Sequence, residues 1–177
     1  MPVRIGFRLR SGALAIDVSG VLLLSFLFAP WIGLRLGLGG AGPGTGGMMS
    51  GAVAGATLIG LLWFGVEALW AATPGKLALG LRVGTDDGHE APLPVTVQRW
   101  ALKNAPTLVG LVAVVVGAVA PAPGRWLGLL SDLTGLVVLA GCFLALGQGL
   151  QALHDRLAGT AVYRAAQLLP REDEPAA

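Results

Sequence analysis

Three acidic residues lie inside long apolar stretches of this 177-residue sequence: Asp17, Glu67 and Asp132. A charged side chain at the middle of a membrane-spanning helix costs roughly 2.5–3.5 kcal/mol on insertion scales, so each of these carboxylates needs a structural or functional reason. Asp17 and Glu67 lie at a similar depth, roughly 9 Å from the same end of the bundle at 1.5 Å per residue. Asp132 enters its stretch from the opposite side. We therefore expect Asp17 and Glu67 to share one layer.

Other ionisable residues are placed to join this layer. Arg10 precedes Asp17 by two helical turns, roughly 10 Å on the same helix face, so we expect its guanidinium to meet that carboxylate. His154 and Asp155 follow the last apolar stretch and reach the same interface. The sequence thus predicts a ring of ionisable groups at one mouth of the bundle, made of Arg10, Asp17, Glu67, His154 and Asp155.

Two interpretations of this ring stay open. Two neighbouring carboxylates share protons, which raises one pKa and suits a cation or proton site. Alternatively, the charges pair with one another and form a structural salt-bridge layer that fixes helix packing. We expect neither an enzyme nor a metal or cofactor site, because no nucleophile–base pair and no second His-rich motif accompany His154, and Cys142 is the single cysteine.

The composition explains why the charges matter. The chain is 54% hydrophobic and 12% charged, with a mean hydropathy of +0.73. Soluble domains have about 25% charged residues, so the charges are too few to cover a soluble domain of this size. The net charge of +2 gives no electrostatic footprint for nucleic acid. The expected partner is the lipid bilayer.

Four stretches are long enough for the roughly 20 residues that cross a bilayer. A cleaved signal peptide is the alternative for the first stretch, but the stretch exceeds the usual apolar length of about 7–15 residues and contains Asp17. We predict an all-α membrane protein, a four-helix transmembrane bundle in one domain over residues 1–167, followed by a disordered acidic tail over 168–177. The predicted spans are about 11–34, 48–72, 105–120 and 126–147.

The distribution of Lys and Arg predicts the orientation. Ten of the twelve basic residues lie before residue 11, between residues 73 and 104, or after residue 147. With four spans these segments share one side, and only Arg35 and Arg125 lie opposite. Because cytoplasmic loops carry an excess of Lys and Arg, we expect both termini and the 73–104 segment to be cytoplasmic.

The expected cytoplasmic segments contain short elements of their own. Residues 94–103 suit an interfacial helix with Pro94 near its first turn and Trp100 at the headgroups. Three segments alternate with the period of a strand, and Asp87-Gly88 is typical of a hairpin turn. They either form a small β element under the bundle or lie unpaired on the headgroups; these segments are residues 3–10, 77–83 and 160–164.

Three blocks resemble the RDD family of small bacterial membrane proteins, named for one Arg and two Asp. They are Arg10-Ser-Gly-Ala-Leu-Ala-Ile-Asp17, the segment Thr73-Pro-Gly-Lys-Leu-Ala-Leu-Gly-Leu-Arg-Val83, and Leu153-His-Asp-Arg-Leu-Ala-Gly-Thr160. The resemblance implies that Arg10, Asp17 and Asp155 are the three signature residues, and that the protein lies in the bacterial inner membrane. The chain departs from the family pattern at Leu77-Ala78, where a basic residue is common, and at Asp132.

The resemblance implies a transport role, since sodium/proton exchange has been suggested for some members. Our first hypothesis is a transporter or cation/proton exchange component in which Asp17 and Glu67 bind the cation or proton, Arg10 modulates them, and His154-Asp155 form an inner gate. No internal repeat of the kind used in alternating access is evident, so such a carrier needs a homo-oligomer. The alternative is a non-catalytic accessory or assembly subunit of a larger membrane complex, in which small residues such as Gly51 and Gly55 permit close helix packing.

Overall fold

The computed structural model describes residues 2–35 and 45–170, except for the side chains of residues 45–50 and 118. Within these ranges, four helices are long and apolar enough to cross a membrane, and together they confirm the predicted all-α membrane bundle. The predicted acidic tail falls mostly outside the described residues. The four helices are α1 (Phe7–Arg35), α2 (Thr45–Trp70), α4 (Leu93–Val119) and α5 (Pro121–Cys142).

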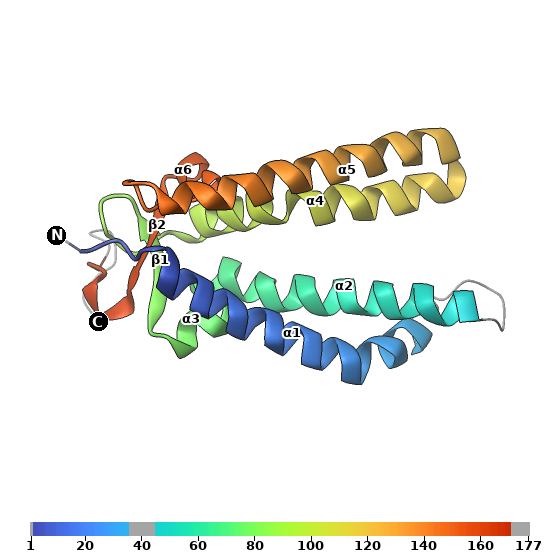
Figure 1. Cartoon of the computed structure of the whole chain (residues 1–177), viewed down its shortest axis with the longest axis horizontal. Helices are drawn as coiled ribbons and strands as arrows, with labels where there is room; N and C mark the ends of the chain where they lie inside the picture. The colour runs from blue at the N-terminus through green and yellow to red at the C-terminus, as the bar shows by residue number, and fades with distance from the viewer. Residues whose placement is uncertain (1, 36–44, 171–177) are drawn as a thin grey trace.

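The four long helices form two hairpins (Figure 1). Helix α1 packs along α2, and α4 packs along α5. The hairpins meet through α2 and α4 and diverge toward the end where α5 begins. The first and last described segments of the chain and all the short elements lie at the other end, which we call the terminal end. The three basic segments therefore share one end, as the count of Lys and Arg predicted.

Small residues bring the first two helices close together. A Cβ atom on Gly55 would overlap the backbone carbonyl of Ala29, and one on Gly33 would overlap the backbone of Gly51. The spacing of Gly51 and Gly55 thus serves packing of α2 against α1 within the first hairpin.

A two-stranded antiparallel sheet lies at the terminal end. Strand β1 (Leu81–Thr85) pairs with β2 (Thr160–Arg164) in a register that places Val83 opposite Val162. Leu81, Val83 and Val162 are almost fully buried with Ile5 of the N-terminal segment and Ala13 of α1. The sheet confirms the predicted β element: β2 coincides with the predicted segment 160–164, whereas β1 shares only residues 81–83 with the predicted segment 77–83. Through Ile5, the sheet also holds the segment that precedes α1 against strand β2.

The N-terminal strand predicted over residues 3–10 does not form. Helix α1 already begins at Phe7, because the first span continues as a helix beyond its apolar part. Only the preceding residues meet the sheet, where the Ile5 amide donates to the Val162 carbonyl at 2.8 Å. Residues 77–78 are also helical, since Thr73 caps the short helix α3 (Pro74–Ala78) and Pro74 occupies its first turn.

The predicted interfacial helix and third span are one continuous helix, α4, with Pro106 inside it. Residues 94–103 do not form a separate helix along the lipid headgroups, because Arg99 and Lys103 point into the protein and contact Glu67. Helix α5 starts two residues after α4 ends. It is followed by the 3₁₀ turn η1 (Phe143–Leu146), the short helix α6 (Leu153–Leu157), β2 and the turn η2 (Ala165–Gln167).

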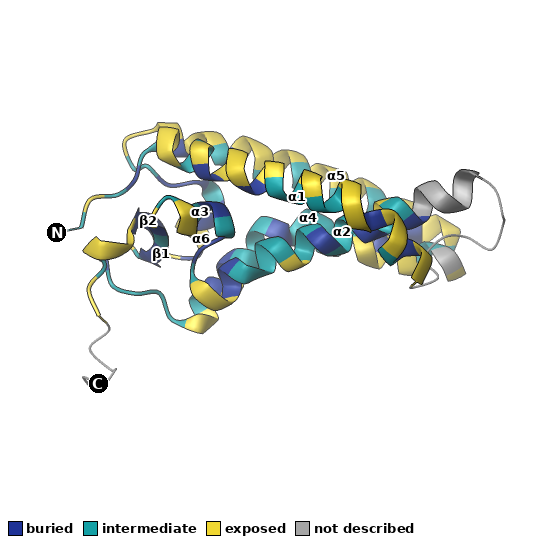
Figure 2. Cartoon of the chain, turned by 90° about the horizontal axis from the view of Figure 1, so that it is seen from below, coloured by how far each residue is buried: buried dark blue, intermediate teal, exposed yellow. Residues whose placement is uncertain are grey.

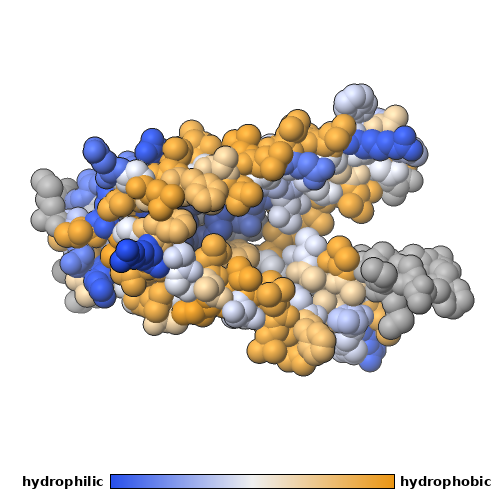
Figure 3. Space-filling model, in the orientation of Figure 1, coloured by the Kyte–Doolittle hydropathy of each residue, from blue (hydrophilic) through white to orange (hydrophobic). Residues whose placement is uncertain are grey.

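The outer faces of the long helices are apolar and exposed. Phe26 is 83% exposed, Val115 70% and Trp126 74%, a distribution that suits contact with lipid. Burial is shown along the bundle in Figure 2, where the short elements of the terminal end enclose buried residues. In the space-filling view, apolar residues dominate the long helices and hydrophilic ones gather at the terminal end (Figure 3). The polar interior of the terminal end is therefore the candidate functional region.

Candidate functional site

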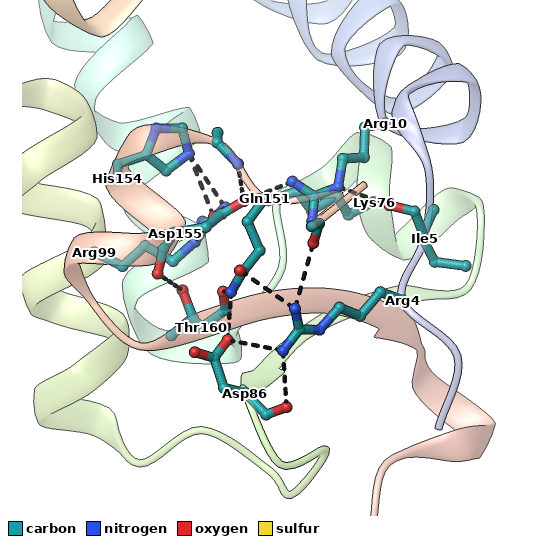
Figure 4. A network of polar contacts seen from close by, with 12 residues as sticks. Arg4, Ile5, Arg10, Lys76, Asp86, Arg99, Gln151, His154, Asp155 and Thr160 are labelled. Carbon is teal, nitrogen blue, oxygen red and sulfur yellow. Dashed lines mark hydrogen bonds and ion pairs between the residues drawn. The ribbon is translucent and has the colours of Figure 1, made fainter. Parts of the chain in front are cut away.

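Asp155 of α6 is completely buried and is held by two arginines (Figure 4). Its Oδ2 accepts from Arg10 Nη1 at 2.6 Å, and its Oδ1 accepts from Arg99 Nε at 2.8 Å and lies 2.7 Å from Arg99 Nη2. The Ala152 amide also donates to Oδ2, at 3.1 Å. Burial acts against the charged form, but Arg99 and Arg10 together outweigh it and hold the pKa of Asp155 well below its usual range. Asp155 therefore joins the first and second hairpins as a carboxylate.

Glu67, near the terminal end of α2, is 1% exposed and contacts three cations. Its Oε1 accepts from Arg99 Nη1 at 2.5 Å and from the Lys76 ammonium, while its Oε2 accepts from Lys103 Nζ at 2.6 Å. Lys103 Nζ also lies 4.8 Å from the centre of the Phe64 ring. Arg99 thus bridges Glu67 and Asp155. We call these six residues the buried cluster: Arg10, Glu67, Lys76, Arg99, Lys103 and Asp155.

Asp17 has a separate set of partners. Its carboxylate accepts from Trp63 Nε1 at 2.9 Å, from Thr73 Oγ1 at 2.5 Å and from the Gly75 amide at 2.7 Å. The expected Arg10–Asp17 pair does not form, because the Arg10 side chain turns toward the terminal end. There its Nε donates to the Ile5 carbonyl and its Nη1 to Asp155. Asp17 therefore anchors the turn that starts α3.

His154 borders the buried cluster without joining it as a charge. Its Nε2 lies 3.5 Å from Arg99 Nη2. Burial lowers its pKa to about 3, and the positive charge of Arg99 adds to this shift. His154 is neutral at physiological pH. Its Nδ1 is buried and has no hydrogen-bond partner within the described ranges.

The buried cluster contains four cations and two carboxylates, so it carries an excess of positive charge. Lys76 is the member whose charge is least favoured. Burial is the main cause that lowers its pKa, to about 7, and Arg99 and Lys103 add to that effect against the attraction of Glu67. The excess positive charge disfavours a metal cation at this place. It favours a group that releases a proton near neutral pH.

Of the predicted ring, the structure brings Arg10, Glu67, His154 and Asp155 to one region and gives Asp17 its own partners. Lys76, Arg99 and Lys103 are missing from the predicted ring. A signal for two of them exists in the sequence, because Arg99 and Lys103 are four residues apart and so share a helix face. For Lys76, the single sequence signal for a buried side chain is its position directly after Thr73-Pro-Gly.

A cleft of about 670 Å³ opens between the hairpins, where Figure 3 shows the molecule hollowed. Ser131 Oγ donates to the Pro106 carbonyl at 2.8 Å on its wall. Asp132 is exposed in the cleft and has no hydrogen bond or ion pair within the described ranges. Pro106 lies three residues from Lys103, so the cleft ends within one helical turn of the buried cluster. Its lining includes Thr57, Pro106, Thr107, Gly110, Ser131 and Asp132.

Comparison with known proteins agrees with this arrangement. The model of the RDD family matches residues 5–159, a range that contains Arg10, Asp17 and Asp155 together with the whole buried cluster. Searches of the curated proteins and of the solved structures gave no significant match. Because the family match covers most of the chain and the helices suit a multi-pass membrane protein, the chain belongs to the RDD family.

Proposed function

We propose that this protein is a proton-exchanging component of a transport system in the bacterial inner membrane, with its terminal end in the cytoplasm. The excess of Lys and Arg in the segments of the terminal end supports this orientation. Family membership supports the membrane location. The observation that carries the proposed activity is the buried Lys76–Glu67 contact, because it holds an ammonium group whose pKa lies close to neutral.

Proton release from Lys76 leaves the rest of the buried cluster paired. Glu67 keeps its contacts with Arg99 and Lys103, and Asp155 keeps Arg10 and Arg99. The buried cluster then holds three cations against two carboxylates, so its excess charge falls. A group that changes charge near pH 7 without breaking the surrounding pairs suits repeated protonation.

The cleft between the hairpins supports access to this group from the opposite half of the membrane. It carries hydroxyl groups and the carboxylate of Asp132, and it ends within one turn of Lys103. The hairpins diverge on either side of it (Figure 1), so another chain is needed to close it toward lipid. We therefore propose that transport requires a homo-oligomer or a larger membrane complex.

The first test is a direct titration of Lys76. The sequence contains only two lysines, Lys76 and Lys103. Carbon-13 labelling of the lysine ε-carbons therefore gives two NMR signals, and the Lys76→Arg variant identifies which one is Lys76. We expect that signal to titrate near pH 7. A midpoint above about 9, close to the ordinary lysine pKa, contradicts the proposal.

The second test measures proton flux in proteoliposomes that contain a pH-sensitive dye. Lys76→Arg keeps the positive charge but does not release a proton near neutral pH, so flux is expected to fall at least tenfold, as for a lost general acid–base group. Arg82→Lys is the control, since Arg82 is partly exposed on β1 and pairs with Glu90 outside the buried cluster. Equal flux in wild type and Lys76→Arg contradicts the proposed site.

The second candidate function is that of an accessory subunit that assembles with a larger membrane complex. Asp132 favours it, since an unpaired carboxylate inside a span is costly and a Lys or Arg on a partner's helix would neutralise it. Purification from native membranes in mild detergent tests this candidate. Wild type is expected to elute as a complex and Asp132→Asn as the free chain, with Glu90→Gln as the control. Elution of wild type as the free chain contradicts it.

A further inference from the structure

A second groove lies on the α4–α5 hairpin and shares no lining residue with the cleft between the hairpins. Its volume is about 250 Å³, and its walls are almost entirely apolar. Leu133 and Val137 on its α5 wall are 61% and 56% exposed, so the groove is open to the hydrocarbon of the bilayer. Helix α6 closes one end. The lining includes Leu102, Ala105, Leu133, Val137, His154 and Leu157.

His154 is the residue that connects this groove with the buried cluster. One ring nitrogen, Nε2, lies 3.5 Å from both Arg99 Nη2 and Asp155 Oδ1. Of the two contacts, the one with Arg99 has the geometry of a hydrogen bond, and an arginine only donates. The neutral imidazole must therefore accept at Nε2 and carry its proton at Nδ1, a tautomer assigned here from its partner. The two nitrogens point in roughly opposite directions, so Nδ1–H points away from Arg99. Figure 4 shows the labelled ring with one nitrogen turned toward Arg99.

The Nδ1–H donor has no acceptor in the described part of the chain. His154 is only 9% exposed, and Nδ1 itself has no exposed surface. Buried donors in native proteins are almost always paired with protein or with ordered water. An apolar groove cannot hold such a water, since a water needs two or more polar partners. The missing acceptor must therefore belong to a molecule that is itself mostly apolar.

We propose that this groove binds a membrane glycerophospholipid, with an acyl chain along α4 and α5 and an ester carbonyl oxygen accepting the His154 Nδ1–H. The ester carbonyl is the lipid acceptor that lies where headgroup and hydrocarbon meet. The chemistry of the groove matches it, with one donor at the end closed by α6 and apolar walls beyond. The oxygen reaches Nδ1 by displacing an apolar side chain of the groove wall. Binding here is independent of proton exchange at Lys76.

The probe is a diester phosphatidylglycerol compared with its diether analogue, which has the same headgroup and chain length but no ester carbonyl. Native mass spectrometry of the full chain in detergent measures how much of each lipid is retained. One hydrogen bond of ordinary net strength corresponds to roughly a fivefold preference for the diester. Wild type is expected to show this preference, and His154→Phe, which keeps the ring but not the donor, is expected to show none.

A second pair of variants tests the groove itself. Val137→Trp fills it and is expected to reduce retention of both lipids at least fivefold. Leu130→Trp, on an exposed position of α5 outside the groove, is the matched control and is expected to retain both lipids. Equal retention of diester and diether by wild type, or equal loss in the two tryptophan variants, overturns the proposal. The wild-type comparison decides the matter even where His154→Phe does not fold.

Discussion

Replacement of Asp155 by Asn probes the buried cluster with the smallest change of shape. The substitution removes one charge and exchanges one acceptor oxygen for an NH₂ group that faces arginine donors. The carboxylate is completely buried and receives hydrogen bonds from Arg10, Arg99 and the Ala152 amide. Breaking a buried ion pair by removal of one partner costs about 3–5 kcal/mol. For a chain of this size, that loss lowers the melting temperature by roughly 6–20 °C.

The single Cys142 makes the assay simple, because a thiol-reactive fluorophore reports unfolding of the detergent-solubilised chain at one place. Glu90→Gln is the control: Glu90 is 41% exposed and pairs with Arg82, and such a pair contributes about 0–1 kcal/mol. The double variant Arg10→Met, Asp155→Asn is expected to lose less than the sum of the single variants, because the two residues interact directly. A melting temperature for Asp155→Asn equal to that of Glu90→Gln would refute the reasoning.

Three further outcomes follow from packing and charge. Gly55→Ala is expected to lower the free energy of unfolding by about 1–3 kcal/mol, because the new methyl group overlaps the Ala29 carbonyl. Gly60→Ala on the same helix meets no other atom and is expected to raise it by up to about 1 kcal/mol. Thermal melts of the two variants check this difference. The folded chain binds the Lys76 proton less tightly than the unfolded chain, so the melting temperature of wild type is expected to rise between about pH 7 and 10, and this rise should be reduced in Lys76→Met. The lowered pKa of Asp155 stabilises the fold above about pH 4, and this stabilisation is lost as the pH falls below about 4 toward the folded-state pKa. In an acid titration followed by near-ultraviolet circular dichroism, the stability of Asp155→Asn should therefore depend less on pH than that of wild type.

The sequence predicted the bundle well, because spans and sidedness depend on local composition. A run of apolar residues crosses the membrane whatever its neighbours are, and the placement of Lys and Arg needs no knowledge of contacts. The small sheet was predicted in part, since alternation is a local signal: the segment 160–164 coincides with β2, but only residues 81–83 of the predicted 77–83 belong to β1. These predictions use residues that are close together in the chain.

The contact partners of the charged residues could not be predicted from the sequence. Arg10 and Asp17 lie on one helix, and spacing alone favoured a pair between them, but the partner of Arg10 is 145 residues away in the chain. Trp63, Thr73 and Gly75 satisfy Asp17 with neutral donors, which no charge pattern indicates. Arg99 is a similar case: it lies next to Trp100 in the predicted interfacial helix, and a basic residue near an aromatic one is typical of an interface, but its side chain contacts Glu67. Contacts between distant segments decide these cases.

The bonds to Asp155 also have a consequence for how the protein is made. Each hairpin consists of neighbouring segments and can form as soon as it is synthesised, and Glu67 of α2 already meets Arg99 and Lys103 of α4. The carboxylate that ties α1 to α4, however, comes from residue 155. A chain released before that point would hold Arg10 and Arg99 without their shared partner and would lack β2. Incomplete chains would thus expose Arg10 without its carboxylate partner and an unpaired β1 at the terminal end, features by which cellular proteases can distinguish them from finished ones.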